Sequence, residues 1–360
     1  MSEVKINTKN KSSNIRKETQ IENDDLSSKY QKMNPIEHVL RLPDTYIGSI
    51  EFKETNEYII VCVDCKDTIK LKNIQINPGF INIVEEILVN AIDAFSRTKQ
   101  KNKTLNGKDK LKCVTNINIT IDNDGKITIF NNGDGIDIAE HPTEKIYIPQ
   151  MVFGELLTSG NYDKNEEKIT GGKNGYGAKL TNIYSTYFKV ETVDRHRKLK
   201  YEQEFKNNLS VKEKPIITKY KKDPYTQITF IPDYKKFGME TISEDMIALI
   251  KKRAYDIVAT TNGKIEVSFN GEKISVKDFK SYMSLYIDKS DVKKEEDTET
   301  SIDIVDDDNL FVHQVINDRW MVGACLTPTF GFKQVSFVNG INTTRGGKQV
   351  DYIIKQFTSH

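Results

Sequence analysis

The sequence predicts a mixed α+β fold, because amphipathic helical stretches and short strand-like runs follow one another along its 360 residues. Apolar residues recur with helical periodicity at residues 35–42, 80–95, 149–157, 178–185 and 242–258. Alternating or β-rich runs occur at residues 58–63, 117–121, 126–130, 188–193, 227–231, 265–269, 320–326 and 334–338. The length and a hydrophobic content of 37% are sufficient for two domains with their own cores.

Polar stretches divide the chain. Residues 1–29 are rich in lysine and asparagine and almost free of aromatic side chains, which predicts a flexible N-terminal arm. The stretches at 96–112 and 288–308 are predicted to be solvated loops or insertions. A Thr-Asn-Gly turn ending at Gly263 separates the last long helical pattern from a new series of strands. We therefore expect a first domain at 30–262 and a second domain at 263–360.

Composition excludes several classes of protein. No apolar run is long enough to cross a bilayer and the N-terminus has no signal-peptide core, so we expect an intracellular protein without a membrane partner. A net charge of +1 gives no overall attraction to nucleic acid, and any DNA contact must come from local clusters such as the lysines at 99–112, which are also typical of a solvated loop. Cys62 and Cys65 form a C-x-x-C without a second metal-spaced pair, which favours small core or edge residues over a zinc or redox site.

The predicted helix at 80–95 carries a polar column beside its apolar face. Its apolar stripe consists of Phe80, Ile83, Val84, Ile87, Leu88, Ala91 and Phe95. Glu86, Asn90 and Asp93 stand at i, i+4 and i+7, which stacks them on another face. Glu86 can activate a water for attack on a γ-phosphate, the Asn90 carbonyl oxygen is a suitable Mg²⁺ ligand, and Asp93 can orient a neighbour. The alternative is an ordinary solvated helix face.

A glycine-rich stretch at 171–179 opens the next helical pattern and ends in Lys179. Its glycines allow the backbone to approach an anion closely, and the lysine adds a positive charge, which together indicate a polyphosphate site. The spacing fits neither the P-loop nor the dinucleotide template. The alternative is a surface turn that caps a helix.

Two further polar segments follow predicted secondary structure. Asn131 ends a buried strand and precedes Gly133 and Gly135, where an amide can pair with an adenine edge and the glycines leave room for the base. An ordinary hairpin turn is the alternative. The segment 158–161, Thr-Ser-Gly-Asn, offers hydroxyl and amide groups suited to ribose or phosphate.

These elements, in this order, resemble the nucleotide-binding fold shared by the ATPase domains of DNA gyrase, the heat-shock chaperone, sensor histidine kinases and mismatch-repair proteins. Longer runs are similar to eukaryotic-type DNA topoisomerase II over about residues 30–357. These runs are Pro43-Asp-Thr-Tyr-Ile-Gly-Ser49, Glu86-Ile-Leu-Val-Asn-Ala91, Val152-Phe-Gly-Glu-Leu-Leu-Thr-Ser159, Thr170-Gly-Gly-Lys-Asn-Gly-Tyr-Gly-Ala-Lys-Leu180, Arg253-Ala-Tyr-Asp256 and Ser336-Phe-Val-Asn-Gly-Ile341, with Gly346-Gly347.

The resemblance implies a sandwich in which helices cover one face of a mixed sheet, followed by a ribosomal-protein-S5-like transducer domain that is incomplete at its C-terminus. It also implies ATP binding with Mg²⁺, ATP hydrolysis, and a homodimer that forms on ATP binding and captures duplex DNA in the full-length enzyme. The N-terminal arm is expected to cross to the partner protomer. The DNA-cleavage core and a transducer lysine that reaches the γ-phosphate are absent from this sequence, so weak turnover and no DNA cleavage are expected.

The resemblance also assigns residues. Glu86 corresponds to the general base, Asn90 to the Mg²⁺ ligand and Asn131 to the amide near the base. Ser159 and Asn161 correspond to ribose and phosphate contacts, with Gly160 where the family more often has serine, and Thr226 corresponds to a threonine near the adenine. The loop that closes over the phosphates corresponds to Gly172, Lys173, Asn174, Gly175, Tyr176, Gly177, Ala178 and Lys179. Asp134 and Asp137 depart from the family, which commonly has lysine and proline there.

Two other functions remain compatible with the sequence. One is another ATPase of the same fold, a chaperone or a mismatch-repair protein. The other is a non-catalytic module that dimerises when it binds a nucleotide. The missing transducer lysine favours this alternative, whereas the presence of Glu86 argues against a complete loss of catalysis. The expected location is the nucleus for a eukaryotic source, or the host cell or virion for a viral one.

Overall fold

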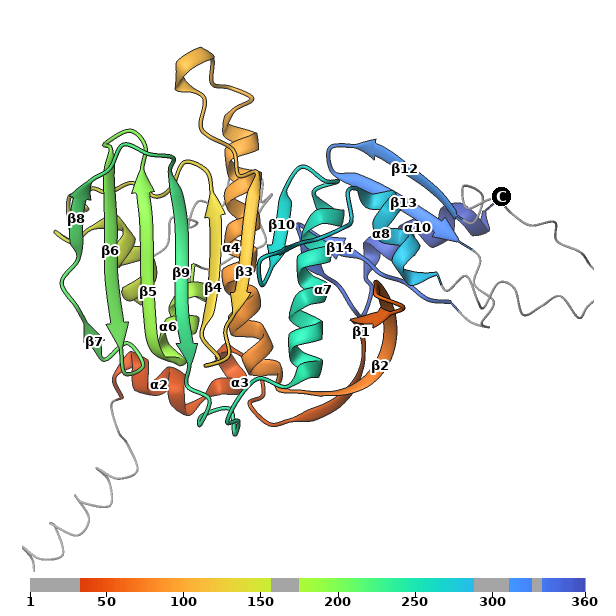
Figure 1. Cartoon of the computed structure of the whole chain (residues 1–360), viewed down its shortest axis with the longest axis horizontal. Helices are drawn as coiled ribbons and strands as arrows, with labels where there is room; N and C mark the ends of the chain where they lie inside the picture. The colour runs from red at the N-terminus through yellow and green to blue at the C-terminus, as the bar shows by residue number, and fades with distance from the viewer. Residues whose placement is uncertain (1–32, 157–174, 288–310, 326–331, 360) are drawn as a thin grey trace, which may run out of the picture.

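The computed structural model describes residues 33–156, 175–287, 311–325 and 332–359, so the predicted arm at 1–29 and the predicted insertion at 288–308 lie outside the described residues. A nine-stranded mixed sheet dominates the described part (Figure 1). Its strands are β3 (Asn116–Ile121), β4 (Ile127–Asn132), β5 (Ser185–Asp194), β6 (Leu199–Lys206), β7 (Val211–Lys212), β8 (Ile216–Lys219), β9 (Tyr225–Pro232), β10 (Glu266–Phe269) and β11 (Glu272–Lys273). The spatial order is β11-β10-β3-β4-β9-β5-β6-β7, with β8 also on β6.

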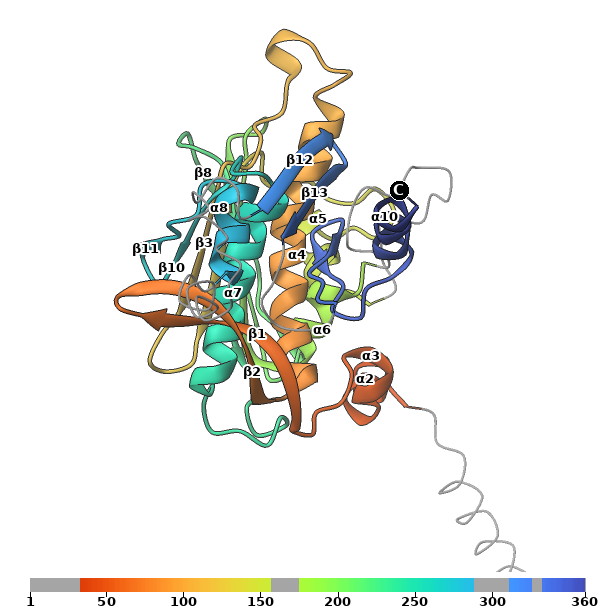
Figure 2. The same cartoon turned by 90° about the vertical axis from the view of Figure 1, so that its right-hand side faces the viewer.

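Three helices cover one face of this sheet. They are α4 (Pro78–Lys101), α5 (Ile148–Gly154) and α6 (Gly177–Ile183), and they lie behind the strands in Figure 1 and to their right in Figure 2. The strands alternate accordingly, as in β4, where every second residue from Ile127 is buried. The predicted sandwich, with helices on one face of a mixed sheet, is confirmed.

The helix α4 is set up by its first residues. Pro78 occupies the first turn, and the side chain of Asn77 accepts a hydrogen bond from Phe80 N and donates another to Phe237 O at 3.0 Å. The predicted apolar stripe is buried from Phe80 to Ala91, with Phe95 half-buried. The helix therefore begins at its proline and packs with the predicted face against the sheet.

The prediction of a solvated loop from residue 96 onward was wrong for its first part. The helix α4 continues to Lys101, and within this extension Thr98 is buried and its hydroxyl donates to Ala94 O at 2.6 Å. The chain then returns through a single 3₁₀ turn, η1 (Gly107–Asp109), and Asn102 exchanges two hydrogen bonds with the backbone of Leu111. The result is the protrusion at the top of Figure 1.

A long hairpin of β1 (Lys53–Val63) and β2 (Lys66–Ile76) lies outside the large sheet and packs on α7 (Glu244–Thr260). Only residues 58–63 of it were predicted. Cys62 and Cys65 flank its turn and are exposed, so they are not core residues, and the described residues contain no group of three metal-binding side chains.

The remaining elements are small. At the N-terminal side these are α2 (Pro35–Arg41) and α3 (Pro43–Tyr46); after the large sheet they are α8 (Phe279–Met283), η2 (Ser284–Tyr286), β12 (Phe311–Asn317), β13 (Trp320–Cys325), β14 (Phe337–Val338), β15 (Ile341–Asn342) and α10 (Lys348–Thr358). The strand predicted at 334–338 is reduced to β14. Because β10 pairs in parallel with β3, the large sheet includes residues after 262, and the division into domains at 262–263 stays a prediction.

Candidate active site

The catalytic candidate Glu86 faces the end of the glycine-rich stretch. A Cβ atom added to Gly177, the first residue of α6, would lie 1.8 Å from Glu86 Oε2, so any other residue there would displace the Glu86 carboxylate from its position. The Thr181 hydroxyl donates to Ile83 O at 2.8 Å and fixes α6 against α4. Packing between the two helices thus places a carboxylate directly over the backbone at the start of α6.

The polar column on α4 is not a solvated face. Asp93 is 2% exposed, and Glu86 and Asn90 are half-buried. Burial raises the pKa of the Glu86 carboxyl group, and the nearby charges of Glu85 and Asp93 raise it further. A carboxylate whose pKa is raised toward neutrality is a better proton acceptor, because it takes up a proton more readily during a reaction near neutral pH.

Asn131 and Thr226 are neighbours across two strands. They are paired residues of β4 and β9, and Asn131 is 8% exposed with its Nδ2 donating to Asn132 O at 2.9 Å. The Thr226 hydroxyl lies 3.0 Å from that of Thr192 on β5, which also accepts from Ile136 N. The structure therefore brings together the two residues assigned to the adenine end of a nucleotide.

The glycines after Asn131 are also required by packing within the protein. Gly135 has φ +73°, and a Cβ there would lie 1.9 Å from Val193 O; at Gly133, φ is +124° and the added atom would lie 3.0 Å from Val114. The backbone of this turn is approached by other parts of the protein, and this close internal packing explains both glycines without a ligand.

Lys179 lies in the first turn of α6 and is 1% exposed. Burial lowers the pKa of its ammonium group to about 8, an effect that the charge of Glu155 partly offsets. The pKa of Lys179 therefore lies near neutral pH, where a small change in its surroundings alters its charge. Of the other loop residues, Gly175 has a positive φ, Tyr176 is half-buried and precedes α6, and Ala178 is buried.

Six predicted site residues lie outside the described residues. They are Ser159, Gly160, Asn161, Gly172, Lys173 and Asn174. Their assignments stay predictions.

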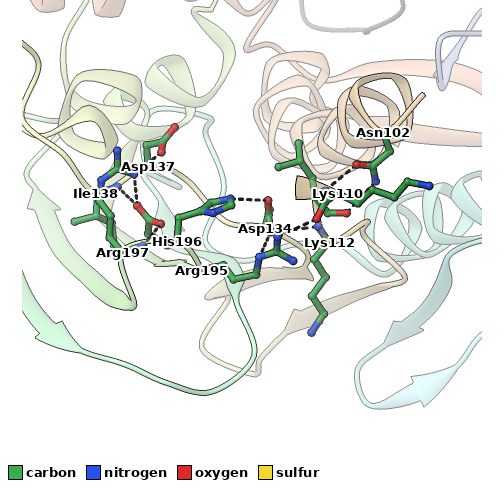
Figure 3. A network of polar contacts seen from close by, with 11 residues as sticks. Asn102, Lys110, Lys112, Asp134, Asp137, Ile138, Arg195, His196 and Arg197 are labelled. Atoms are coloured by element: carbon green, nitrogen blue, oxygen red, sulfur yellow. Dashed lines mark hydrogen bonds and ion pairs between the residues drawn. The ribbon is translucent and has the colours of Figure 1, made fainter. Parts of the chain in front are cut away.

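Two polar networks beside this site were not predicted (Figure 3). Asp134 accepts a hydrogen bond from Lys112 N at 3.2 Å and lies 3.1 Å from Arg195 Nε and 3.6 Å from His196 Nε2. Arg197 Nη1 lies 2.5 Å from Asp137 and 2.7 Å from the buried Asp194. The two aspartates that depart from the family pattern therefore both contact cations of the β5–β6 turn. In the sequence, the run Arg195-His196-Arg197 was the only indication of these cationic partners.

These features define a class of protein. A mixed sheet backed by α4, α5 and α6, with an acidic residue of the central helix set over a glycine-rich turn, is the arrangement expected for the ATPase fold shared by DNA gyrase and the heat-shock chaperone.

Comparisons with known proteins narrow the class. The ATPase region of topoisomerase II from Saccharomyces cerevisiae matches with a TM-score of 0.79 at 40% identity, covering 93% of this chain and 80% of that one. The ATPase and transducer domains of DNA topoisomerase II from Balamuthia mandrillaris match with a TM-score of 0.78 at 38% identity, covering 92% and 77%. The chain belongs to the DNA topoisomerase II family and corresponds to its ATPase region.

The full-length relatives are much longer than this chain. DNA topoisomerase 2 of Acanthamoeba polyphaga mimivirus is 44% identical over 339 residues, which are 93% of this chain and 24% of the relative. DNA topoisomerase 2-beta of Gallus gallus is 42% identical over 333 residues, 91% and 18% respectively. No protein-family model matches the chain. Among the described helices, none combines the length and the apolar character needed to span a membrane.

Proposed function

We propose that this chain binds ATP with Mg²⁺ and hydrolyses it, as the N-terminal gate of a type II DNA topoisomerase that dimerises on ATP binding and captures a DNA duplex. The observation that carries the proposal is the contact between Glu86 and the start of α6, where a Cβ on Gly177 would overlap the carboxylate. This contact joins a proton acceptor to the loop whose backbone is suited to phosphate.

Each predicted site residue has a role in this proposal. Glu86 accepts a proton from the attacking water, and Lys179 supplies positive charge to the phosphates. Asn131 and Thr226 lie at the adenine end. Ser159, Gly160 and Asn161 are proposed to contact ribose and phosphate, and the loop from Gly172 to Lys179 to close over the phosphates.

The residues present fit a magnesium ion that is shared with the nucleotide. No group of three His, Cys, Asp or Glu side chains forms a metal cage within the described ranges, whereas Asn90 offers an amide oxygen one helical turn from Glu86. Mg²⁺ prefers one or two protein oxygens together with phosphate oxygens and water, and when bound it neutralises phosphate charge. Asn90 is therefore the proposed ligand.

Sedimentation and calorimetry with a non-hydrolysable ATP analogue test the proposal. We expect a monomer that becomes a dimer with the analogue and Mg²⁺, because the arm before residue 30 is proposed to bind the partner protomer. Asn90→Ala is expected to weaken Mg²⁺-dependent binding by about tenfold or more. The matched control is Asn73→Ala, at an exposed position of β2. A chain that stays monomeric at tens of micromolar with the analogue contradicts the dimer, and undetectable nucleotide binding contradicts the function.

The relatives reported above are all topoisomerases, which leaves no support for a chaperone or a mismatch-repair protein. A non-catalytic dimerisation module remains the second candidate, and turnover measurements decide between it and an ATPase. The relatives come from eukaryotes and a virus, so the proposed location is a nucleus or an infected cell.

Lys179 makes nucleotide affinity depend on pH. Its pKa is lowered to about 8, so above that pH the free protein holds a neutral lysine, and binding a polyphosphate requires it to take up a proton. We expect the dissociation constant to be nearly constant below pH 7 and to rise about fivefold from pH 8 to pH 9. Calorimetry in two buffers of different ionisation enthalpy measures both affinity and proton uptake. Lys179→Arg should remove the dependence, and a flat wild-type curve would contradict this role.

A further inference from the structure

Three charged residues of α7, the buried Lys252 and Asp256 and the partly buried Arg253, form a group that we call the α7 cluster. Asp256 Oδ2 lies 2.9 Å from Lys252 Nζ and 3.2 Å from Arg253 Nη1, and the Tyr282 hydroxyl donates to Asp256 Oδ1 at 2.6 Å. Lys252 is 1% exposed and Asp256 3%. Charges are buried at this depth only when they are closely paired.

The α7 cluster reaches the helix that carries the catalytic candidate. Arg253 Nε lies 2.6 Å from Oε1 of Glu85, the residue that precedes Glu86 on α4. Glu57 of β1 also lies close enough to Arg253, Lys252 and Glu85 to interact with their charges. Arg253 therefore bridges two carboxylates, Glu85 and Asp256, through two different nitrogen atoms, which the planar guanidinium group does and a lysine does not.

The hairpin of β14 and β15 packs on the same place. The Phe337 ring centroid lies 5.5 Å from Lys252 Nζ. A cavity of about 30 Å³ lies between α4, α7 and the hairpin, with Arg253, Glu85 and Gly340 in its lining. A Cβ added to Gly340, whose φ is +80°, would lie 3.2 Å from Ile92 Cγ2. The hairpin thus touches both helices beside the Glu85–Arg253 pair.

We propose that Arg253 is a positioning residue for Glu86, and that the β14–β15 hairpin acts on this arrangement through the α7 cluster. Successive residues of a helix are about 100° apart, so holding Glu85 against α7 turns Glu86 toward Gly177. A movement of the hairpin against α4 and α7 is then transmitted to the hydrolytic carboxylate. The inference depends on the proposed hydrolysis of ATP.

A double-mutant cycle on the whole chain tests the pair, with Glu85→Gln, Arg253→Gln and the double variant. Single-turnover hydrolysis, the nucleotide dissociation constant and the melting temperature are measured for each. We expect each single variant to hydrolyse about tenfold more slowly while affinity changes by less than about threefold. The double variant should be no slower than the slower single one, because both remove one contact. The matched control is Lys251→Gln, which is also on α7 and breaks an ion pair of 2.8 Å with Asp67 of β2.

The outcomes separate positioning from stability. Variants that melt earlier but hydrolyse at the wild-type rate overturn the inference, as do rate effects that multiply in the double variant. If Arg253→Gln does not fold, Glu85→Gln, whose side chain is 27% exposed, carries the test alone, and a wild-type rate contradicts the role. Glu86→Gln is run in parallel. If Glu86→Gln hydrolyses ATP at the wild-type rate, the proposed function is contradicted. If Glu86→Gln loses hydrolysis while Glu85→Gln hydrolyses at the wild-type rate, only the positioning role of Arg253 is contradicted.

The hairpin is tested separately with Phe337→Leu, which removes the ring beside Lys252 and keeps an apolar side chain. Val338→Ala, at a 43% exposed neighbour, is the control. We expect a lower hydrolysis rate for Phe337→Leu alone, with unchanged nucleotide affinity. Equal rates for both variants and the wild type would remove the hairpin from the proposal.

Discussion

Replacing Glu86 by glutamine is expected to slow ATP hydrolysis by about 10²–10⁴-fold while nucleotide binding is retained, because glutamine keeps the shape of the side chain and cannot accept a proton. Release of labelled phosphate under single-turnover conditions is the suitable measurement, because it reports the chemical step separately from product release. Since burial and the neighbouring acids raise the pKa of Glu86, the wild-type rate should fall as the pH is lowered through a value above the ordinary carboxyl range.

The control is Glu240→Gln, which removes a carboxylate at an exposed position. Equal measurable rates for Glu86→Gln and the wild type would exclude Glu86 as the base, whereas no turnover in either protein would favour the non-catalytic dimerisation module.

Replacing Asp256 by alanine is expected to lower the free energy of unfolding by about 3–5 kcal/mol, because it leaves a buried ammonium and a guanidinium without their shared carboxylate. Lys252 is 1% exposed, so water cannot easily replace the lost partner. The Tyr282 hydroxyl also loses its acceptor. Urea unfolding followed by circular dichroism measures the change.

An exposed ion pair on the large sheet provides the comparison for Asp256 of α7. Glu266 and Lys273 pair across β10 and β11 with side chains 49% and 67% exposed. Glu266→Ala should therefore cost about 0–1 kcal/mol. If the two alanine variants unfold at the same urea concentration, the α7 cluster does not stabilise the protein in the way described.

The helix α4 shows what the sequence could predict. The spacing of its apolar residues identified the buried face, and the same periodicity placed Glu86, Asn90 and Asp93 on one side. The glycine at 177 was predicted to let an anion approach the backbone, whereas the structure shows that it also makes room for the Glu86 carboxylate. These inferences use only neighbours within a few helical turns, where the period of the helix decides which side chains meet.

Other features depend on distant partners and were missed for that reason. The charges at 252, 253 and 256 resemble a solvated helix face, and their burial depends on Glu85, which is 168 positions away along the chain. The strand β2 contains several lysines and lacks a clear apolar run, so its own residues do not predict a strand. Its pairing with β1 in the structure identifies it. The glycines at 133 and 135 suggested a ligand because the sequence does not show that β5 and Val114 occupy the space beside them.

The parallel pairing of β10 with β3 affects how the chain can fold. Glu266 pairs with Asn116, so the outer edge of β3 has no partner until the ribosome has delivered the whole of α7 and the strand after it. Contacts between such distant segments form late, because a long loop must close first. During that interval β3 is an open edge, able to pair with another nascent chain. A shorter piece ending at residue 262 would keep this edge permanently, which makes aggregation its expected fate.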